Sequence, residues 1–368
     1  MTDRIAVFFD ARVFDHDTGT GLFEGPPSPY LDVAERHPEN GERIRNMESV
    51  LRRGPIAGRL DWHCAPPAGD DQLTLFHDAD YIAKLAAIPA DQGNRSTGTT
   101  VFGPGSWPVI KTAAGLAVAA ADHVWSGTGD IAYAMARPPG HHAQPAMTDG
   151  YCFVNNIGVA IEVLRRKGMK RACVIDWDVH HGNGTQEGFY TDPDVLTVSV
   201  HMDHGAWGPT HTQTGGADEI GSGAGKGANL NVPLPYGSGD TAYTRAFDEI
   251  VAPAVRLFAP EIVFIAAGQD ASQFDPNGRQ TVTMAGFREL GRRARGLADE
   301  LAGGKLVLVQ EGGYAISYAA YCLHTTLEGV LNEDAMLDDP IGYMPEHTEH
   351  LAAAIERIMK TRADALAG

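Results

Sequence analysis

Short, continuous apolar runs alternate along most of the chain with longer segments in which apolar residues recur at a helical period. The runs with the length and the Val, Ile and Ala content of strands are 5–9, 131–136, 172–176, 195–201, 262–266 and 306–310. The segments with a helical period are 41–53, 80–87, 109–124, 157–167, 242–257, 285–301 and 318–331. Strands that are apolar throughout are typical of parallel sheets with both faces buried. We therefore predict an α/β fold, in which helices cover both faces of a mainly parallel, multi-stranded sheet.

The alternation continues without a low-complexity linker or an internal repeat. With 368 residues, 43% of them hydrophobic, the chain can bury one large core or two ordinary ones. Because no linker interrupts the pattern, we predict a single domain over 1–368. The Gly- and Pro-rich stretch 10–36 and the Gly/Thr/Ser connection 89–107 are predicted loops, and connections as long as the second are more often functional than structural.

The formal net charge of −18 narrows the choice of partners. Nucleic-acid binding relies on clustered Lys and Arg, which the sequence does not show, so no nucleic-acid partner is expected. The acidity mildly favours cationic substrates, although acidity also simply keeps proteins soluble. We find no leader-like N-terminus and no apolar run of about 18 residues, so we expect no membrane span and a cytoplasmic protein. The four cysteines lack a CxxC spacing and are expected to be free thiols.

Polar clusters stand at the ends of the predicted strands. They occupy 137–142, 176–181, 199–201, 267–270 and 311–314. In parallel sheets, ligands bind outside the carboxyl ends of the strands. Because all these clusters follow that rule, we predict one functional site at this edge of the sheet.

Asp176, Asp178 and His180 are spaced two apart around the end of an apolar run. On a strand, this spacing would point all three side chains to one face, where they could converge on a cation. A lone Asp-x-His is weak evidence, since such triplets also form N-caps and surface turns. With Asp270 from another strand end, however, three protein ligands would leave positions open for water and substrate, as in catalytic metal sites. Zn²⁺ is the first choice, and Fe²⁺, Co²⁺ or Mn²⁺ suit the same oxygen-rich set.

Two further features offer proton transfer and oxyanion stabilisation. His141 and His142 follow Pro138-Pro139-Gly140 at the end of a predicted strand. A neutral imidazole there can take a proton from a polarised water and later return one to a leaving group, although paired histidines are often just a polar turn. Tyr314, on the turn Gly312-Gly313-Tyr314, offers a hydroxyl that can donate to a developing alkoxide. Taken alone, this tyrosine fits a packing role better.

Together, these segments resemble the histone deacetylase superfamily, which includes acetylpolyamine amidohydrolases and bacterial deacetylase-like amidohydrolases. The resemblance extends from His37-Pro38-Glu39 to Glu311-Gly312-Gly313-Tyr314. Within it, Glu311 and the segment 182–186 are similar to the class II branch rather than to class I. It implies the arginase-deacetylase fold and one catalytic metal held by Asp178, His180 and Asp270. The implied catalytic residues are His141 paired with Asp176, His142 as principal general base oriented by Asn183, and Tyr314 polarising the scissile carbonyl.

The resemblance also implies sites for monovalent cations, K⁺ or Na⁺, and for the substrate. One cation site matches Asp176, Ser199 and the main-chain oxygen of Val200, and a second matches main-chain oxygens of Phe189, Asp192 and Val195. The acyl tunnel matches Gly150 and Tyr151 on one wall and Trp207 or Gly208 on the other. Asn277 stands near the acidic gatekeeper position of polyamine-selective members, and Gln269 replaces the family's usual Phe before a metal ligand. The lack of an acidic residue at Asn277 weakens the expectation of a polyamine substrate, and Gln269 makes the surroundings of the metal ligand more polar.

The expected function is that of a metal-dependent amidohydrolase that removes a short acyl group from an amine by attack of metal-bound water. Acyl-lysine and a small acylated amine are the expected substrates, and an acetylpolyamine or a small xenobiotic amide is the alternative. An arginase-like hydrolase with two manganese ions is disfavoured, because the sequence lacks the extra carboxylates that such a site needs. A catalytically weak acyl-lysine-binding module is a further alternative, which could dispense with Tyr314. A homo-oligomer, dimeric or tetrameric, is also expected.

Overall fold

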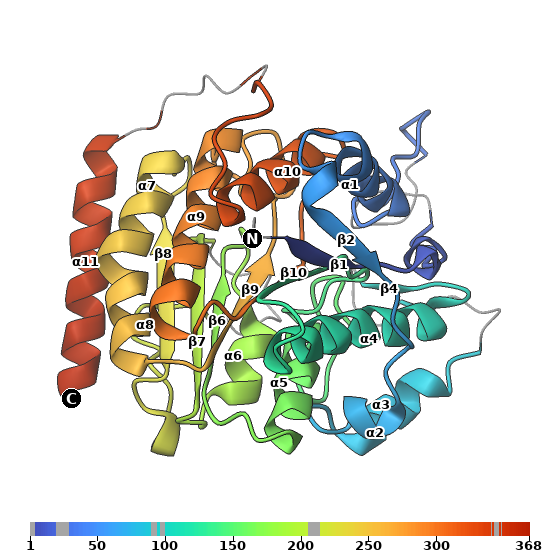
Figure 1. Cartoon of the computed structure of the whole chain (residues 1–368), viewed down its shortest axis with the longest axis horizontal. Coiled ribbons are helices and arrows are strands. Elements are labelled where there is room, and N and C mark those ends of the chain that lie inside the picture. Colours follow the sequence, from blue (N-terminus) through green and yellow to red (C-terminus); the bar gives the residue numbers. More distant parts are fainter. Residues whose placement is uncertain are drawn as a thin grey trace.

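An eight-stranded parallel sheet forms the centre of the protein in the computed structural model (Figure 1). In spatial order, its strands are β2 (Leu60–His63), β1 (Ile5–Phe8), β5 (Ile131–Ala134), β10 (Leu306–Gln310), β9 (Ile262–Ala267), β6 (Ala172–Asp176), β7 (Val195–Met202) and β8 (Asn229–Leu234). Every neighbouring pair runs parallel. The structure describes residues 4–19, 29–89, 94–95, 100–204, 214–339, 341, 346 and 348–368. The predicted α/β fold with a mainly parallel sheet is confirmed.

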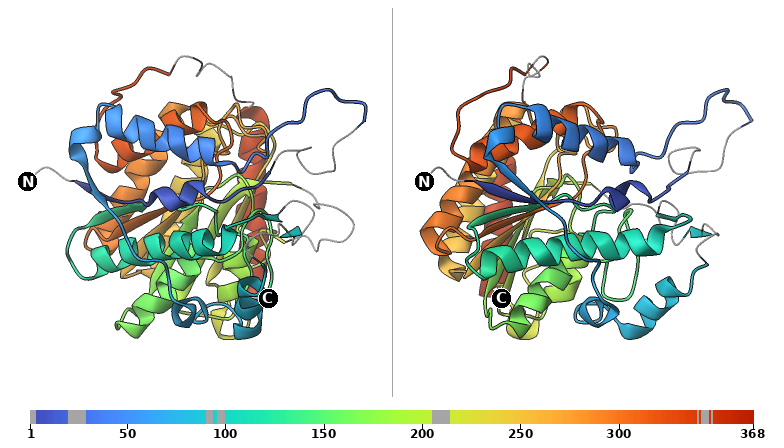
Figure 2. Two further views of the ribbon diagram at one scale, coloured as in Figure 1. Left: turned by 90° about the vertical axis from the view of Figure 1, so that its right-hand side faces the viewer. Right: turned by 45° about the vertical axis from the view of Figure 1, so that its right-hand side comes forward.

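Helices cover both faces of this sheet (Figure 2). One layer contains α1 (Gly41–Arg53), α7 (Asp240–Ala246), α8 (Ala252–Phe258), α9 (Met284–Leu301) and α10 (Tyr318–Val330). The other layer contains α4 (Ser106–Trp125), α5 (Asn156–Arg166) and α6 (Asn183–Phe189). Helix α11 (Thr348–Ala367) packs along the edge strand β8, where Arg362 donates to the main-chain oxygen of Asn229 at 2.6 Å. This contact covers part of a strand edge that would otherwise present unpaired backbone groups.

The remaining elements are short. They are the 3₁₀ helices η1 (Ala11–Phe14), η2 (Ala57–Arg59) and η3 (Gly223–Gly225), the π-helical turn η4 (Phe247–Val251), the helices α2 (Asp70–Leu73) and α3 (Ala79–Ala86), and the strand pair β3 (Asn94–Arg95) and β4 (Val101–Phe102). Two predictions therefore need correction. The predicted loop 10–36 contains η1, and the predicted continuous helix 242–257 is divided by η4 into α7 and α8. The β3–β4 pair lies within the predicted loop 89–107.

The core is continuous through the central strands. All residues of β1, β5, β6, β7, β9 and β10 are buried, as expected for strands with helices on both faces. On one face, the small side chains of Ala113, Ala117 and Ala120 in α4 are almost completely buried and allow this helix to lie close to the sheet and to α5. Within the described part of the chain, no helix is both long and apolar enough to cross a bilayer.

Candidate metal-dependent active site

The predicted polar clusters converge at the carboxyl ends of four adjacent strands. Strands β5, β10, β9 and β6 are neighbours in that order, and the turns that follow them contain His141–His142, Glu311–Tyr314, Asp270 and Asp178–His180, respectively. Because parallel strands end at the same edge of the sheet, these turns meet there. The clusters after these four strands therefore lie together at one edge of the sheet, and the functional site there stays a prediction.

The turn after β6 differs from the sequence-based expectation. Strand β6 ends at Asp176, so Asp178 and His180 do not alternate along a strand, and the one-face argument for their grouping is wrong. Instead, backbone N–H groups of the turn bind carboxylates. The N–H of Asp178 donates to Asp176 Oδ1 at 3.0 Å, and the N–H of Val179 donates to Asp270 Oδ1 at 2.9 Å. These bonds replace strand pairing and bring the turn against Asp270.

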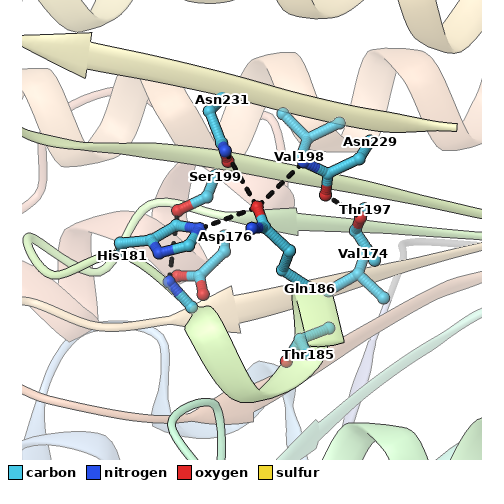
Figure 3. A pocket seen from close by; sticks show the side chains of 11 residues that line it. Val174, Asp176, His181, Thr185, Gln186, Thr197, Val198, Ser199, Asn229 and Asn231 are labelled. Atoms are coloured by element: carbon cyan, nitrogen blue, oxygen red, sulfur yellow. Dashed lines mark hydrogen bonds between the residues drawn. The ribbon is translucent and has the colours of Figure 1, made fainter. Parts of the chain in front are cut away.

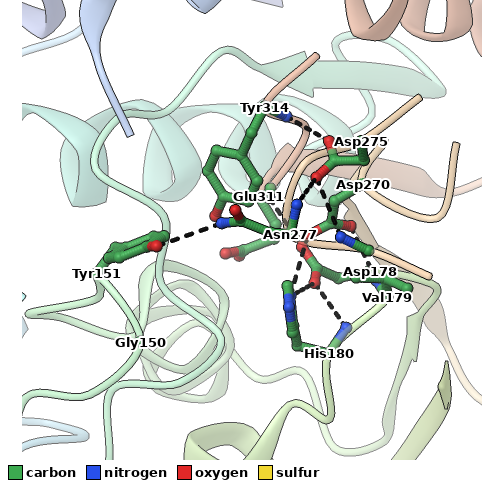
Figure 4. A network of polar contacts seen from close by, with 12 residues as sticks. Gly150, Tyr151, Asp178, Val179, His180, Asp270, Asp275, Asn277, Glu311 and Tyr314 are labelled. Carbon is green, nitrogen blue, oxygen red and sulfur yellow. Dashed lines mark hydrogen bonds and ion pairs between the residues drawn. The ribbon is translucent and has the colours of Figure 1, made fainter. Parts of the chain in front are cut away.

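Asp178, His180 and Asp270 form a compact, buried group (Figure 4). Their ligand atoms all lie within 4.8 Å of one another. His180 Nδ1 lies 3.2 Å from Asp178 Oδ1 and 3.1 Å from Asp270 Oδ2. The other oxygen of each carboxylate is held by the backbone, because Gly312 N–H donates to Asp178 Oδ2 at 2.8 Å and Val179 N–H to Asp270 Oδ1. Each carboxylate is therefore fixed by one oxygen and presents the other to the group.

The electrostatics of this group fit a cation. Burial and the neighbouring charge of Asp178 raise the pKa of Asp270, because two buried carboxylates side by side repel each other. Burial alone would lower the pKa of His180, but Asp178 and Asp270 outweigh it and raise that pKa to about 10. A divalent ion would compensate both carboxylates at once. Two carboxylates and one imidazole suit Zn²⁺, Fe²⁺, Co²⁺ or Mn²⁺.

Glycines allow the close approach of these carboxylates. A β-carbon at Gly312 would lie 2.2 Å from Asp270 Oδ2, and one at Gly268 would lie 2.3 Å from Asp178 Oδ2. Both distances are far below van der Waals contact, so any larger residue would displace a ligand. The sequence places each glycine within two residues of a predicted site residue, which is the signal that could have found them.

The two histidines have different partners. His141 Nδ1 lies 2.8 Å from Asp176 Oδ2, and His142 Nδ1 lies 2.7 Å from Asn183 Oδ1, so both predicted pairs are present as contacts. Burial would lower the pKa of His141, but the carboxylates of Asp178 and Asp176 raise it well above its usual value. Burial and the nearby positive charges of His141 and His180 lower the pKa of His142. The two rings, with centroids 4.0 Å apart, therefore favour opposite protonation states.

Asp149 extends the chain of contacts behind His142. Asn183 Nδ2 donates to Asp149 Oδ2 at 2.8 Å, so the amide oxygen of Asn183 is the atom that faces His142. This orientation requires a hydrogen on His142 Nδ1 and leaves Nε2 free to accept a proton. Sequence reasoning missed Asp149, although it stands next to the predicted tunnel residue Gly150.

Tyr314 lies in the same site, with only 7% of its surface exposed (Figure 4). Its ring packs edge-on against Tyr151, with centroids 5.6 Å apart, and the Arg43 guanidinium lies 5.4 Å from its centroid. Burial raises the pKa of its phenol well above the usual value, so the hydroxyl stays protonated and able to donate. The main-chain N–H of Tyr314 donates to Asp275 Oδ2 at 2.7 Å. Sequence reasoning missed Asp275.

Glu311 lies behind the histidine turn. Its Oε2 accepts the N–H of Gly140 at 2.6 Å and that of His141 at 3.1 Å. Burial raises its pKa to about 7, although the charge of His141 acts in the opposite direction. Glu311, His141 and Cys152 also bring ligand-type atoms within 4.8 Å of one another. The sequence identified Glu311 only as a mark of the class II branch.

The residues predicted for the first monovalent-cation site are neighbours. Asp176 and Ser199 are paired across β6 and β7, and Val200 follows on β7. Both side chains border a small polar cavity in front of α6 (Figure 3). Ser199 Oγ already accepts the N–H of Gly182 at 3.3 Å and lies 2.9 Å from His201 Nδ1. Cation binding there stays a prediction.

The residues predicted for the second cation site lie in the connection from α6 to β7 and at the start of β7. The main-chain oxygen of Phe189 accepts the N–H of Asp192 at 2.9 Å, and Asp192 Oδ2 pairs with Arg165 at 2.6 Å. Val195 is the first residue of β7 and is buried. This site also stays a prediction.

The predicted tunnel residues are only partly described. Asn277 Nδ2 donates to the hydroxyl of Tyr151 at 3.2 Å, which joins two of them, and Tyr151 follows Gly150 (Figure 4). Trp207 and Gly208 lie outside the described residues. The side chain of Gln269 makes polar contacts. It donates to the main-chain oxygen of Ala267 at 2.8 Å and accepts from Gln310 at 2.8 Å.

Comparisons with known proteins agree with this geometry. The model of the histone deacetylase domain family matches residues 37–330. Histone deacetylase 8 of Arabidopsis thaliana is 50% identical over 364 residues, which cover 97% of this chain and 96% of that protein. A histone deacetylase-like amidohydrolase of Pseudomonas aeruginosa is 40% identical over 345 residues, or 93% and 90% of the two chains. The crystal structure of the HDA15 HD domain has a TM-score of 0.83 and 31% identity, and the match covers 98% of both chains. This chain therefore belongs to the histone deacetylase family and has its arginase-deacetylase α/β fold.

Proposed function

We propose that this protein is a metal-dependent amidohydrolase that removes a short acyl group from an amine, either acyl-lysine or a small acylated amine. One observation carries the proposal. The buried group of Asp178, His180 and Asp270 adjoins a neutral imidazole, His142, and a protonated phenol, Tyr314, on neighbouring turns. Ligands, proton acceptor and oxyanion donor are the parts that hydrolysis of an amide requires.

Asp178, His180 and Asp270 would hold the metal, and Zn²⁺ is the ion we propose. Such an ion polarises a bound water and the carbonyl oxygen of an amide. No third carboxylate joins this group among the described residues, which speaks against the arginase-like site with two manganese ions. The predicted homo-oligomer and cytoplasmic location stay predictions.

We assign the two histidines different roles, proton transfer to His142 and a fixed positive charge to His141. His142 is neutral, and Asn183 holds its Nδ1–H, so Nε2 is the atom that takes a proton from water. His142 then carries the proton that the leaving nitrogen needs. His141, held protonated by Asp176 and Asp178, places positive charge beside the site, where it favours a developing oxyanion.

Tyr314→Phe is expected to reduce turnover on the order of 10²-fold or more, as for the loss of one oxyanion donor. The ring would still pack against Tyr151, so the fold and the metal content should not change. Steady-state kinetics, elemental analysis and a melting temperature measure these three properties. Tyr318→Phe is the matched control, because its hydroxyl donates to Asp339 at 2.8 Å in the α10 layer rather than in the site. A near-normal rate for Tyr314→Phe would assign this residue a packing role only.

Acetylspermidine is not expected to be the best substrate. Asn277, which we expect near the acidic gatekeeper position, is neutral and donates to the hydroxyl of Tyr151, so it offers no charge for a polyamine cation. Values of kcat/KM for acetyl, trifluoroacetyl, propionyl and butyryl amides of one amine, compared with acetylspermidine, measure this preference. We expect acyl groups bulkier than acetyl, or compact non-peptide amides, to be accepted. Asn277→Glu should selectively raise the relative kcat/KM of acetylspermidine.

The result that would contradict this prediction can be stated as a ratio of kcat/KM values. Preference of the wild-type protein for acetylspermidine by more than about tenfold, or ~1.4 kcal/mol of transition-state binding, would show that the gatekeeper argument is wrong. Hydrolysis of none of these substrates, with metal bound, would favour the acyl-lysine-binding alternative.

A further inference from the structure

Asp275 gathers four backbone N–H groups on one buried carboxylate (Figure 4). Its Oδ2 accepts from Tyr314 at 2.7 Å and from Ala315 at 3.2 Å. Its Oδ1 accepts from Asn277 at 2.9 Å and from Gly278 at 3.3 Å. Asp275 therefore joins the turn after β9 to the turn after β10.

The turn after β10 needs such a restraint. It contains Gly312 and Gly313, and Gly313 has φ +120°, a conformation that side chains rarely adopt. Glycines lose more conformational freedom on folding than other residues, so a Gly-Gly turn is poorly fixed by its own backbone. The bonds from Asp275 hold the two residues that follow directly, Tyr314 and Ala315.

We propose that Asp275 is a positioning residue that places the Tyr314 hydroxyl over the metal site by holding the main chain on which Tyr314 stands. This inference rests on the proposed role of Tyr314 as oxyanion donor. Asp275 is not among the three metal-ligand residues, and both of its oxygens are occupied by backbone donors, so it acts through Tyr314.

The chemistry requires a carboxylate at this position. Only a carboxylate offers two acceptor oxygens, whereas an asparagine of the same shape would direct its NH₂ group against one pair of N–H donors. Asp275→Asn thus removes the restraint from one side with almost no change in volume. A misplacement of about 1 Å at a catalytic group can cost on the order of 10²-fold in rate.

Asp275→Asn is expected to lower kcat about 10- to 100-fold, with KM changed less than about threefold and with full metal content. The decisive measurement is the double variant with Tyr314→Phe. If Asp275 acts through Tyr314, the double variant is no slower than Tyr314→Phe alone, because the group being positioned is already absent. Multiplied losses would overturn the proposal, as would loss of metal from Asp275→Asn, which would indicate an effect through Asp270.

Asp240→Asn is the matched control. Asp240 also accepts backbone and side-chain bonds in a turn, from Thr283 N–H at 2.8 Å and Thr283 Oγ1 at 2.6 Å, but at the start of α9. It should change the melting temperature without changing kcat. A comparable fall in kcat for Asp240→Asn would show that the effect of Asp275 is general destabilisation, and it would overturn the proposal.

Amide hydrogen exchange tests the restraint without any substrate. The amides of Tyr314 and Ala315 should exchange faster in Asp275→Asn than in the wild type, while those of β9 and β10 stay protected. Unchanged exchange would overturn the proposal even if the rate falls. A wild-type protein that hydrolyses no acylated amine would instead refute the proposed function. Should Asp275→Asn not fold, Asp275→Ser, which retains one acceptor, is measured in the same way.

Discussion

Asp178→Ala and Asp270→Ala are each expected to abolish both metal binding and turnover. Each variant leaves two of the three ligands, and the remaining carboxylate already has one of its two oxygens bound to the backbone, so it cannot replace the missing ligand. Elemental analysis after dialysis gives the metal content, and assays with added Zn²⁺, Fe²⁺, Co²⁺ or Mn²⁺ give the activity. Asp240→Ala, which removes a carboxylate bound to Thr283 at the start of α9, should retain both.

Chelation supplies a second readout that does not depend on activity. A ligand that binds only the folded state stabilises it, so a chelator should lower the melting temperature of the wild-type protein. The same chelator should leave the melting temperatures of Asp178→Ala and Asp270→Ala unchanged, because these variants hold no metal to lose. Full metal occupancy in both variants would contradict the assignment of the ligands.

The central part of the fold could be predicted from the sequence. Segments 172–176 and 306–310 are strands with the predicted bounds, and 41–53 is the predicted helix, because each has an uninterrupted apolar or helical pattern. The edge strands β2 and β8 could not be predicted. Their sequences, Leu60-Asp61-Trp62-His63 and Asn229–Leu234, mix polar and apolar residues. The polar residues of β2 are not buried, whereas Asn229 and Asn231 of β8 are buried and each donates to Gln186 Oε1 at 2.8 Å, a contact that the sequence does not record.

The candidate site was predicted from chemically distinctive residues at strand ends, and the structure brings the predicted ligands, the histidines and Tyr314 close together (Figure 4). The sequence argument that grouped the ligands was partly wrong. Asp178 and His180 are brought together by backbone hydrogen bonds in a turn and not by alternation along a strand. Asp275 and Asp149 were missed for a common reason. Their roles depend on which N–H groups the fold brings to their oxygens, and a single sequence does not record such contacts.

His142→Ala is expected to slow turnover on the order of 10²–10⁴-fold, the usual contribution of a general base. His141→Ala should cost less, because His141 is held protonated by Asp176 and Asp178 and contributes charge rather than proton acceptance. Steady-state kinetics of both variants at full metal occupancy compare the two losses. His324→Ala is the control, since this buried imidazole lies in α10 with its Nδ1 3.0 Å from Glu328 Oε1.

The pH dependence separates the two roles further. Burial and the charge of His141 lower the pKa of His142, so the wild-type rate should persist below neutral pH and fall only as pH drops through that lowered pKa. In His142→Ala, no group is left to titrate in that way, and the acidic limb should disappear or shift. In His141→Ala, one positive charge beside His142 is lost, so the pKa of His142 rises and the acidic limb should move to higher pH. Equal losses of rate, or a larger loss for His141→Ala with the acidic limb unmoved, would instead identify His141 as the proton acceptor.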